Sequence, residues 1–151
     1  QQLTRALTEG EAGRLAWLSL LPRTRVGLYE ITETQIKKGL VDANETIRAS
    51  FGETGFHDFE AQLPGADAKR LLPIWLLTAS GLKPTKIALY RPHTRGGVFY
   101  RLWIYGLPTA VPNAYPGDVM ALVQDGTTCV AFNLTLFELT EDRLQDLSAL
   151  F

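Results

Sequence analysis

The side chains best suited to catalysis or metal binding are the two histidines of this 151-residue chain, His57 and His93. Neither lies three to five residues from another histidine or from the single cysteine, a spacing that zinc sites commonly show. His57 and its neighbour Asp58 would point to opposite faces of a strand, which does not support a Ser-His-Asp relay. The sequence therefore predicts no metal and no cofactor.

Other catalytic patterns are also missing. The glycine pair Gly52-x-x-Gly55 lacks the Lys-Ser/Thr sequence that a phosphate-binding loop needs. Aspartates and glutamates are numerous but scattered, and a site built from two carboxylates has no recognisable motif. We expect no catalytic residue in this chain, which would then not be an enzyme by itself.

A segment rich in turn-forming residues predicts a basic β-hairpin. Its hydrogen-bond donors are Arg91, His93, Thr94, Arg95 and Arg101. A two-stranded ribbon fits the major groove of DNA, and the arginine fork reaches both acceptors of guanine or clamps a phosphate. The alternative is an ordinary solvated turn whose arginines lie along aromatic side chains.

A second donor-rich segment precedes it in the chain. Its candidate contacts to DNA are Lys37, Lys38, Asp42, Asn44, Arg48, Ser50, Thr54, His57 and Asp58. Glycines in this segment allow close backbone approach, and an acid such as Asp58 must accept a hydrogen bond there, for example from a cytosine amino group. The alternative is a mobile surface loop.

Charge is segregated along the chain although the net charge is only −1. Residues 61–117 hold seven basic side chains and one acid, Asp67, whereas the remaining residues hold 8 basic and 15 acidic groups. A basic surface on an otherwise acidic body is typical of a protein that faces a polyanion.

Length and composition predict one globular domain over residues 1–151, since 46% of the residues are hydrophobic and 21% are charged. The longest apolar run, 71–77, is far shorter than a membrane span, and no secretory signal is visible. The single cysteine, Cys129, has apolar neighbours and is expected to be buried in a reducing compartment such as the bacterial cytoplasm. The first residue is not methionine, which indicates a mature chain or a domain excised from a larger enzyme.

Helices are predicted at both ends of the chain, with strands between them. Thr8 and Glu11 form a capping box before a helix over 9–21, and Thr140 begins a closing helix. Alternating or branched residues predict strands at 25–31, 86–90, 98–105, 119–123 and 128–133.

The middle of the chain is less regular. We interpret 42–56 as a long ordered loop, 57–63 as a strand and 66–72 as a helix. Strands about ten residues apart, joined by tight turns, indicate an α+β fold that is mainly β, as a mostly antiparallel barrel or sandwich.

Several short motifs resemble the B-three-type pseudobarrel DNA-recognition domains, in particular those of EcoRII-like restriction endonucleases. The similar motifs are Ile36-Lys37-Lys38, Asp42-Ala43-Asn44, the run from Gly52 to His57, and Thr94-Arg95 between Tyr90 and Tyr100-Arg101. The chain departs from the family pattern at Asp58, where a glutamine is expected, and at Gly97, where an acid is expected.

The resemblance implies an open seven-stranded pseudobarrel with flanking helices, whose two arms grip the major groove of a short specific site in duplex DNA. It adds Tyr100 to the expected DNA contacts. It also implies a target-recognition or effector-binding role in a bacterial restriction endonuclease, with cleavage by a separate nuclease domain that could be fused to this one.

Two other functions stay open. The first is a β-barrel module for a small ligand or a protein, in which Phe99, Trp103 and Tyr105 line a pocket. The second is a hydrolase whose carboxylates are not recognisable from sequence.

Overall fold

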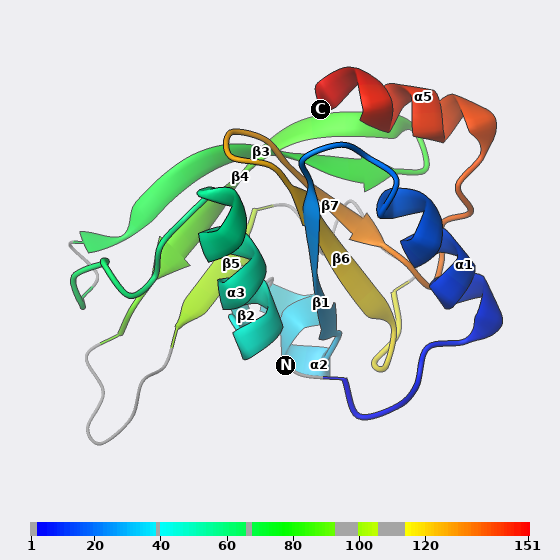
Figure 1. The fold of residues 1–151 in the computed structure, drawn as a ribbon. Helices are drawn as coiled ribbons and strands as arrows, with labels where there is room; N and C mark the ends of the chain where they lie inside the picture. Colours follow the sequence, from blue (N-terminus) through cyan, green and yellow to red (C-terminus); the bar gives the residue numbers. More distant parts are fainter. Residues whose placement is uncertain (1–2, 39, 66–67, 93–99, 106–113) are drawn as a thin grey trace.

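The computed structural model describes residues 3–38, 40–65, 68–92, 100–105 and 114–151. Seven strands form one curled sheet in the order β1-β6-β7-β3-β4-β5-β2 (Figure 1). They are β1 (Arg25–Glu30), β2 (Leu40–Asp42), β3 (Arg70–Thr78), β4 (Gly81–Tyr90), β5 (Arg101–Ile104), β6 (Val119–Gln124) and β7 (Cys129–Asn133). The helices of the described residues are α1 (Glu9–Leu18), α2 (Glu33–Lys38), α3 (Glu45–Thr54) and α5 (Glu141–Leu150).

The sheet is mixed but mostly antiparallel. Neighbouring strands pair antiparallel except β3 and β7, which run parallel and pair at Trp75↔Val130 and Leu76↔Ala131. The order leaves β1 and β2 at the two edges of the sheet. The predicted α+β fold that is mainly β and mostly antiparallel is confirmed.

Each face of the sheet carries its own apolar cluster. The inner cluster contains Tyr29, Leu89 and Leu102 and is closed by Ile47 and Phe51 of α3. The outer cluster contains side chains of β6 and β7 and is closed by α1 and α5, which Figure 1 shows on the same side of the molecule. We call the two sides of the sheet the inner and outer faces.

Local signals begin and end the helices. The capping box predicted for α1 is present, with Thr8 accepting from Glu11 N while the Glu11 carboxylate accepts from Thr8 N. Asn44 caps α3, and Gly55 ends it in the left-handed region at φ 79°. Thr140 caps α5, as predicted.

Three predictions for the middle of the chain are wrong. Residues 42–56 are not a loop, because β2 ends at Asp42 and α3 occupies Glu45–Thr54. Residues 57–63 contain no strand; the buried His57 and Phe59 alternate with exposed neighbours because the chain turns over the end of the inner cluster.

The predicted helix over 66–72 is also wrong in its described part. Lys69 and Arg70 favour a helix locally, but from Arg70 onward the chain pairs with β4 through Arg70↔Leu89 and Leu71↔Ala88. Tertiary pairing therefore overrides local propensity here.

Two further predictions are confirmed. Cys129 is buried and is not in a disulfide. The strand at 86–90 is present and starts earlier, at Gly81. It pairs antiparallel with β5, as a hairpin requires.

Among the described residues, none of the helices has the length and apolar character needed to cross a membrane.

Candidate nucleic-acid interface

The two predicted DNA-binding segments meet at the ring of Tyr100. The guanidinium carbon of Arg48 lies 5.1 Å from the ring centroid, and that of Arg91 lies 5.5 Å from it. Tyr100 itself is buried against Phe59, at a centroid distance of 5.2 Å, and its carbonyl accepts a 2.8 Å hydrogen bond from Ala43 N. A cation–π pair of this kind fixes the position of an arginine without neutralising its charge.

Arg48 is positioned by the start of α3. The Asn44 side chain accepts from Ile47 N at 3.0 Å and donates to Leu28 O on β1 at 3.0 Å, which ties the helix start to the sheet. Nη1 of Arg48 then donates to Ala43 O at 2.8 Å. Among the described residues, this is the hydrogen bond that the Arg48 guanidinium donates.

Arg91 is positioned by the segment 57–65. Its Nη1 donates to Gln62 O at 3.2 Å, while its carbonyl accepts from Gly65 N at 2.7 Å. This segment therefore connects the chain after α3 with the end of β4.

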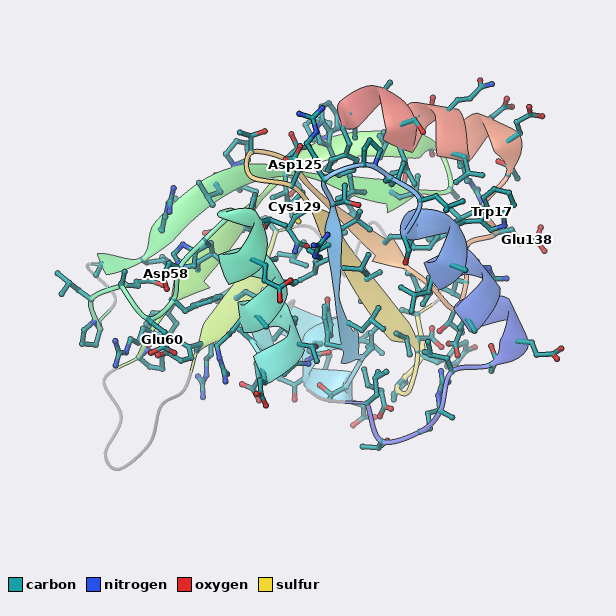
Figure 2. The ribbon with its side chains drawn as sticks, in the orientation of Figure 1. Trp17, Asp58, Glu60, Asp125, Cys129 and Glu138 are labelled. Atoms are coloured by element: carbon teal, nitrogen blue, oxygen red, sulfur yellow. The ribbon has the colours of Figure 1, made fainter. Side chains whose placement is uncertain are left out.

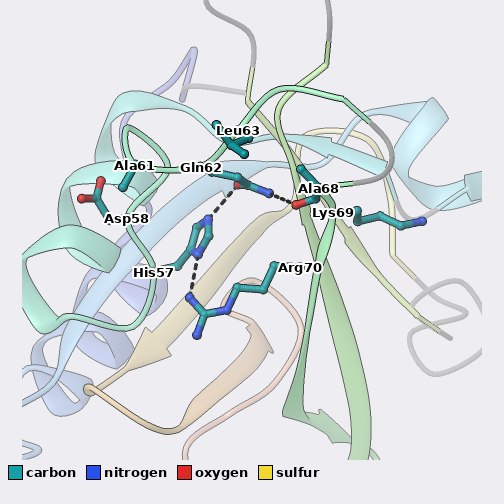
Figure 3. A pocket seen from close by; sticks show the side chains of 8 residues that line it. All are labelled: His57, Asp58, Ala61, Gln62, Leu63, Ala68, Lys69 and Arg70. Carbon is teal, nitrogen blue, oxygen red and sulfur yellow. Dashed lines mark hydrogen bonds between the residues drawn. The ribbon is translucent and has the colours of Figure 1, made fainter.

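A chain of hydrogen bonds continues from Gln62 through His57 to Arg70 (Figure 3). The Gln62 amide donates to Ala68 O at 3.2 Å and Leu89 O at 2.7 Å, so its oxygen is the acceptor for His57 Nε2 at 2.9 Å. His57 is therefore the Nε2-protonated tautomer, and its Nδ1 accepts from Arg70 Nη1 at 3.3 Å.

A groove of about 510 Å³ lies beside this chain of hydrogen bonds. It is lined by His57, Asp58, Ala61, Gln62, Leu63, Ala68, Lys69 and Arg70. The polar atoms of His57 and Gln62 are already engaged, so Lys69, Arg70 and Asp58 supply the charge that a ligand in the groove would meet.

The surroundings shift two pKa values at this site. Burial lowers the pKa of His57 below its ordinary 6.5; the bond to Gln62 partly opposes this, and the Arg70 cation lowers the pKa further. Burial raises the pKa of Tyr100, and the nearby Glu60 carboxylate raises it further. The Tyr100 hydroxyl is buried without a well-formed hydrogen bond.

Three arginine side chains lie around Tyr100 and His57. Within the described part of the chain, Arg48, Arg70 and Arg91 form no ion pair; the ion pairs there are Arg5–Glu11, Arg25–Glu53 and a 3.8 Å contact between Arg101 and Asp42. We call Arg48, Arg70 and Arg91 the arginine cluster.

Two acids lie near the arginine cluster. Asp58 and Glu60 are exposed, and Figure 2 shows them together on the side of the molecule opposite Trp17 and Glu138. Asp58 accepts from Glu60 N at 3.0 Å, so its carboxylate is held in place by its own turn.

Several predicted contacts turn out to make internal bonds. The Ser50 hydroxyl is buried and donates to Ile47 O at 3.0 Å; that of Thr54 donates to Ser50 O at 3.0 Å. Asn44 and His57 are buried as well. These four side chains hold the segment in shape rather than extend from it.

The next predicted contacts lie on α2, on β2 or outside the described residues. Lys37 is exposed on α2 and Asp42 is exposed at the end of β2. His93, Thr94, Arg95 and the side chain of Lys38 lie outside the described residues.

Sequence reasoning missed Arg70, Gln62 and Glu60 as members of this site. Arg70 stands in the basic stretch 61–117, so the charge pattern could have found it. Gln62 carries no such signal, because its role depends on Leu89 O, 27 residues away in the sequence.

The described side chains of this site offer positive charge and hydrogen-bonding groups. Within the described residues, no group of three or more His, Cys, Asp and Glu side chains is arranged to hold a metal ion.

Comparisons with protein-family models, with curated proteins and with solved structures give no significant match to this chain.

Proposed function

We propose that this chain binds double-stranded DNA at a short specific site, as the target-recognition or effector-binding module of a bacterial restriction endonuclease. The observation that carries the proposal is the arginine cluster. Arg48 and Arg91 share the ring of Tyr100, Arg70 is connected to Arg91 through His57 and Gln62, and none of the three forms an ion pair with a described residue. Guanidinium groups that are not engaged in ion pairs are suited to phosphate groups.

The proposed contacts fall into two classes. Arg48, Arg91 and Arg70, with exposed Lys69, would contact phosphates and orient the duplex. Arg95, which lies outside the described residues, would read base edges in the major groove, as the family resemblance implies. Asp58 and Glu60 would accept hydrogen bonds from base amino groups or reject sequences that lack them.

The sheet supports the same proposal. Its order leaves β1 and β2 as separate edges, as an open pseudobarrel requires, and β2 and β5 pair at Val41↔Leu102 just beside the Ala43–Tyr100 contact. In this proposal the cutting residues belong to a nuclease domain outside this chain.

The test is a selection of randomised duplexes at low salt, followed by titration of the enriched duplex at several salt concentrations. The double variant Arg48→Ala/Arg91→Ala should weaken binding and lower the slope of log K against log salt by about 0.9 for each phosphate that is no longer neutralised. Arg143→Ala is the matched control, because Arg143 also lies over an aromatic ring, Phe137, but on α5.

Two results would contradict the proposal. One is a selection that enriches no duplex at low salt. The other is a double variant that keeps full affinity and the full salt slope while it remains folded. Binding that ignores salt altogether would favour the small-ligand or protein module instead.

A further inference from the structure

The outer face of the sheet is covered by helices over only part of its width. The outer cluster closed by α1 and α5 includes Trp75 and Leu77 of β3 and Leu82 of β4. Toward the other ends of these strands, at Leu71 and Ala88, no described helix packs against the outer face.

A row of apolar side chains crosses three strands in this uncovered part. The register aligns Leu71 of β3 with Ala88 of β4, and Ala88 with Trp103 of β5. Leu71 is 52% exposed and Trp103 is 45% exposed, although both occupy regular strand positions. Ala88 between them is buried, so Leu71 and Trp103 supply the exposed apolar surface of this row.

Aromatic and cationic groups continue the row. The ring of Tyr105 lies 6.3 Å from that of Trp103, and Nζ of Lys86 lies 5.0 Å from the Tyr105 centroid. We call Leu71, Lys86, Ala88, Trp103 and Tyr105 the aromatic face.

The charge on this side is positive. Strand alternation places Lys86 and Arg101 on the outer side together with Trp103, and no acid of β3, β4 or β5 lies there. The one described acid beside it is Asp42 of β2, which already contacts Arg101 at 3.8 Å.

We propose that the aromatic face binds single-stranded nucleic acid, with bases stacked on Trp103 and backbone phosphates near Lys86. An exposed indole offers every base a flat surface, and a neighbouring ammonium group complements phosphate. A purely apolar protein segment would cover the Lys86 ammonium group without supplying a counter-charge, whereas a polyanion would supply one.

This surface is separate from the arginine cluster. Tyr100 belongs to the inner cluster, whereas Trp103 lies on the outer face of the same strand region. The proposal therefore stands independently of duplex binding, and the two can fail separately.

The test uses oligothymidylate and the fluorescence of Trp103 in the Trp17→Phe/Trp75→Phe variant, where Trp103 is the single tryptophan left of three. Stacking should quench the emission in a saturable way. Trp103→Ala, followed with a labelled oligonucleotide, should lower affinity about 5- to 100-fold, whereas Trp103→Phe should retain most of it.

Lys86 gives a second test that leaves the aromatic rings in place. Lys86→Ala should weaken binding and lower the salt slope by about 0.7. Lys83→Ala is the control, since Lys83 is exposed on the same strand but has the opposite side-chain direction.

The outcomes separate the two surfaces. An excess of the selected duplex should not displace the oligonucleotide, and Arg48→Ala/Arg91→Ala should bind it normally. The proposal is overturned by absent quenching, by unchanged affinity in both Trp103→Ala and Lys86→Ala, or by full competition with duplex. It is also overturned if the wild-type chain is a dimer that Trp103→Ala dissociates, because a second copy then covers this face.

Discussion

Nη1 of Arg70 lies 3.3 Å from Nδ1 of the buried His57, so a cation points at the imidazole nitrogen that would take up a proton. The other ring nitrogen is held by Gln62 at 2.9 Å. The neutral ring therefore fits its surroundings, and the protonated ring does not. This arrangement connects the segment 57–65 to β3 through a histidine whose pKa is lowered by its burial.

Stability should decrease as the pH falls below about 6.5, the ordinary pKa of histidine, because the pKa of folded His57 is lower. Between these two pKa values the unfolded chain binds a proton that the folded chain does not, so acid favours unfolding. Urea unfolding at pH values between about 5 and 7.5 measures this. His57→Gln should remove the pH dependence of this window, and His93→Gln should leave it; an unchanged dependence in His57→Gln would contradict the assignment.

Glu11 should be a main source of stability near the N-terminus. It is buried, and its bonds to Arg5 chiefly hold its pKa at about 2 rather than 4.5. Glu11→Gln should cost about 2 kcal/mol, whereas Glu9→Gln, an exposed change in the same helical turn, should cost little.

The acid response of Glu11 gives an independent check. Its folded pKa is depressed, so its contribution is present above pH 4.5 and is lost as the pH falls toward 2. Thermal unfolding of wild type and Glu11→Gln over this range should show two curves that converge in acid. Curves that stay parallel would mean that Glu11 acts only through packing.

Gly27 should be irreplaceable because α3 lies against β1 at this point. A Cβ atom there would lie 3.0 Å from the Cα atom of Ile47 and 3.0 Å from Oγ of Ser50. Gly27→Ala should therefore destabilise the fold by about 1–3 kcal/mol. Gly52→Ala, where a Cβ meets nothing within 4 Å, should be neutral or stabilising by about 0.5–1 kcal/mol.

The ring of Tyr100, rather than its hydroxyl, should matter. Tyr100→Phe removes a buried oxygen without a well-formed hydrogen bond, so stability should change by less than about 1 kcal/mol. Tyr100→Leu removes the surface under Arg48 and Arg91 and should cost roughly 2 kcal/mol.

Binding of the selected duplex by the same two variants tests the role of the ring. Tyr100→Phe should bind as wild type does, and Tyr100→Leu should bind more weakly with a smaller salt slope. If both variants bind equally well, the position of Arg48 and Arg91 does not depend on Tyr100.

Local signals predicted much of the fold. The Thr8–Glu11 capping box and the alternation in β1 depend on near neighbours, and both elements are present close to the expected residues. The helix α3 is not predicted, because its glycine, Gly52, and its two threonines are weak helix formers. Its capping residue Asn44 and its terminal Gly55 were available signals, whereas its fit against Gly27 required the tertiary structure.

The candidate site was predicted as two separate segments. Arg48, Arg91 and Tyr100 were each expected to contact DNA, but no sequence pattern places two of them over the third. That arrangement depends on the pairing of β2 with β5 and on the turn that carries Gln62. Arg70 is not predicted for two reasons. Its position depends on the long-range pairing of β3 with β4, and the sequence predicts a helix over 66–72 instead of a strand.

The parallel contact between β3 and β7 joins the two halves of the sheet through just two aligned residue pairs, Trp75↔Val130 and Leu76↔Ala131. Strands β1, β6 and β7 lie on one side of this seam, and β3, β4, β5 and β2 lie on the other. Non-local parallel pairing forms slowly, so the seam should close late in folding. In the native protein, amide hydrogens along it should exchange before those of the β3–β4 hairpin.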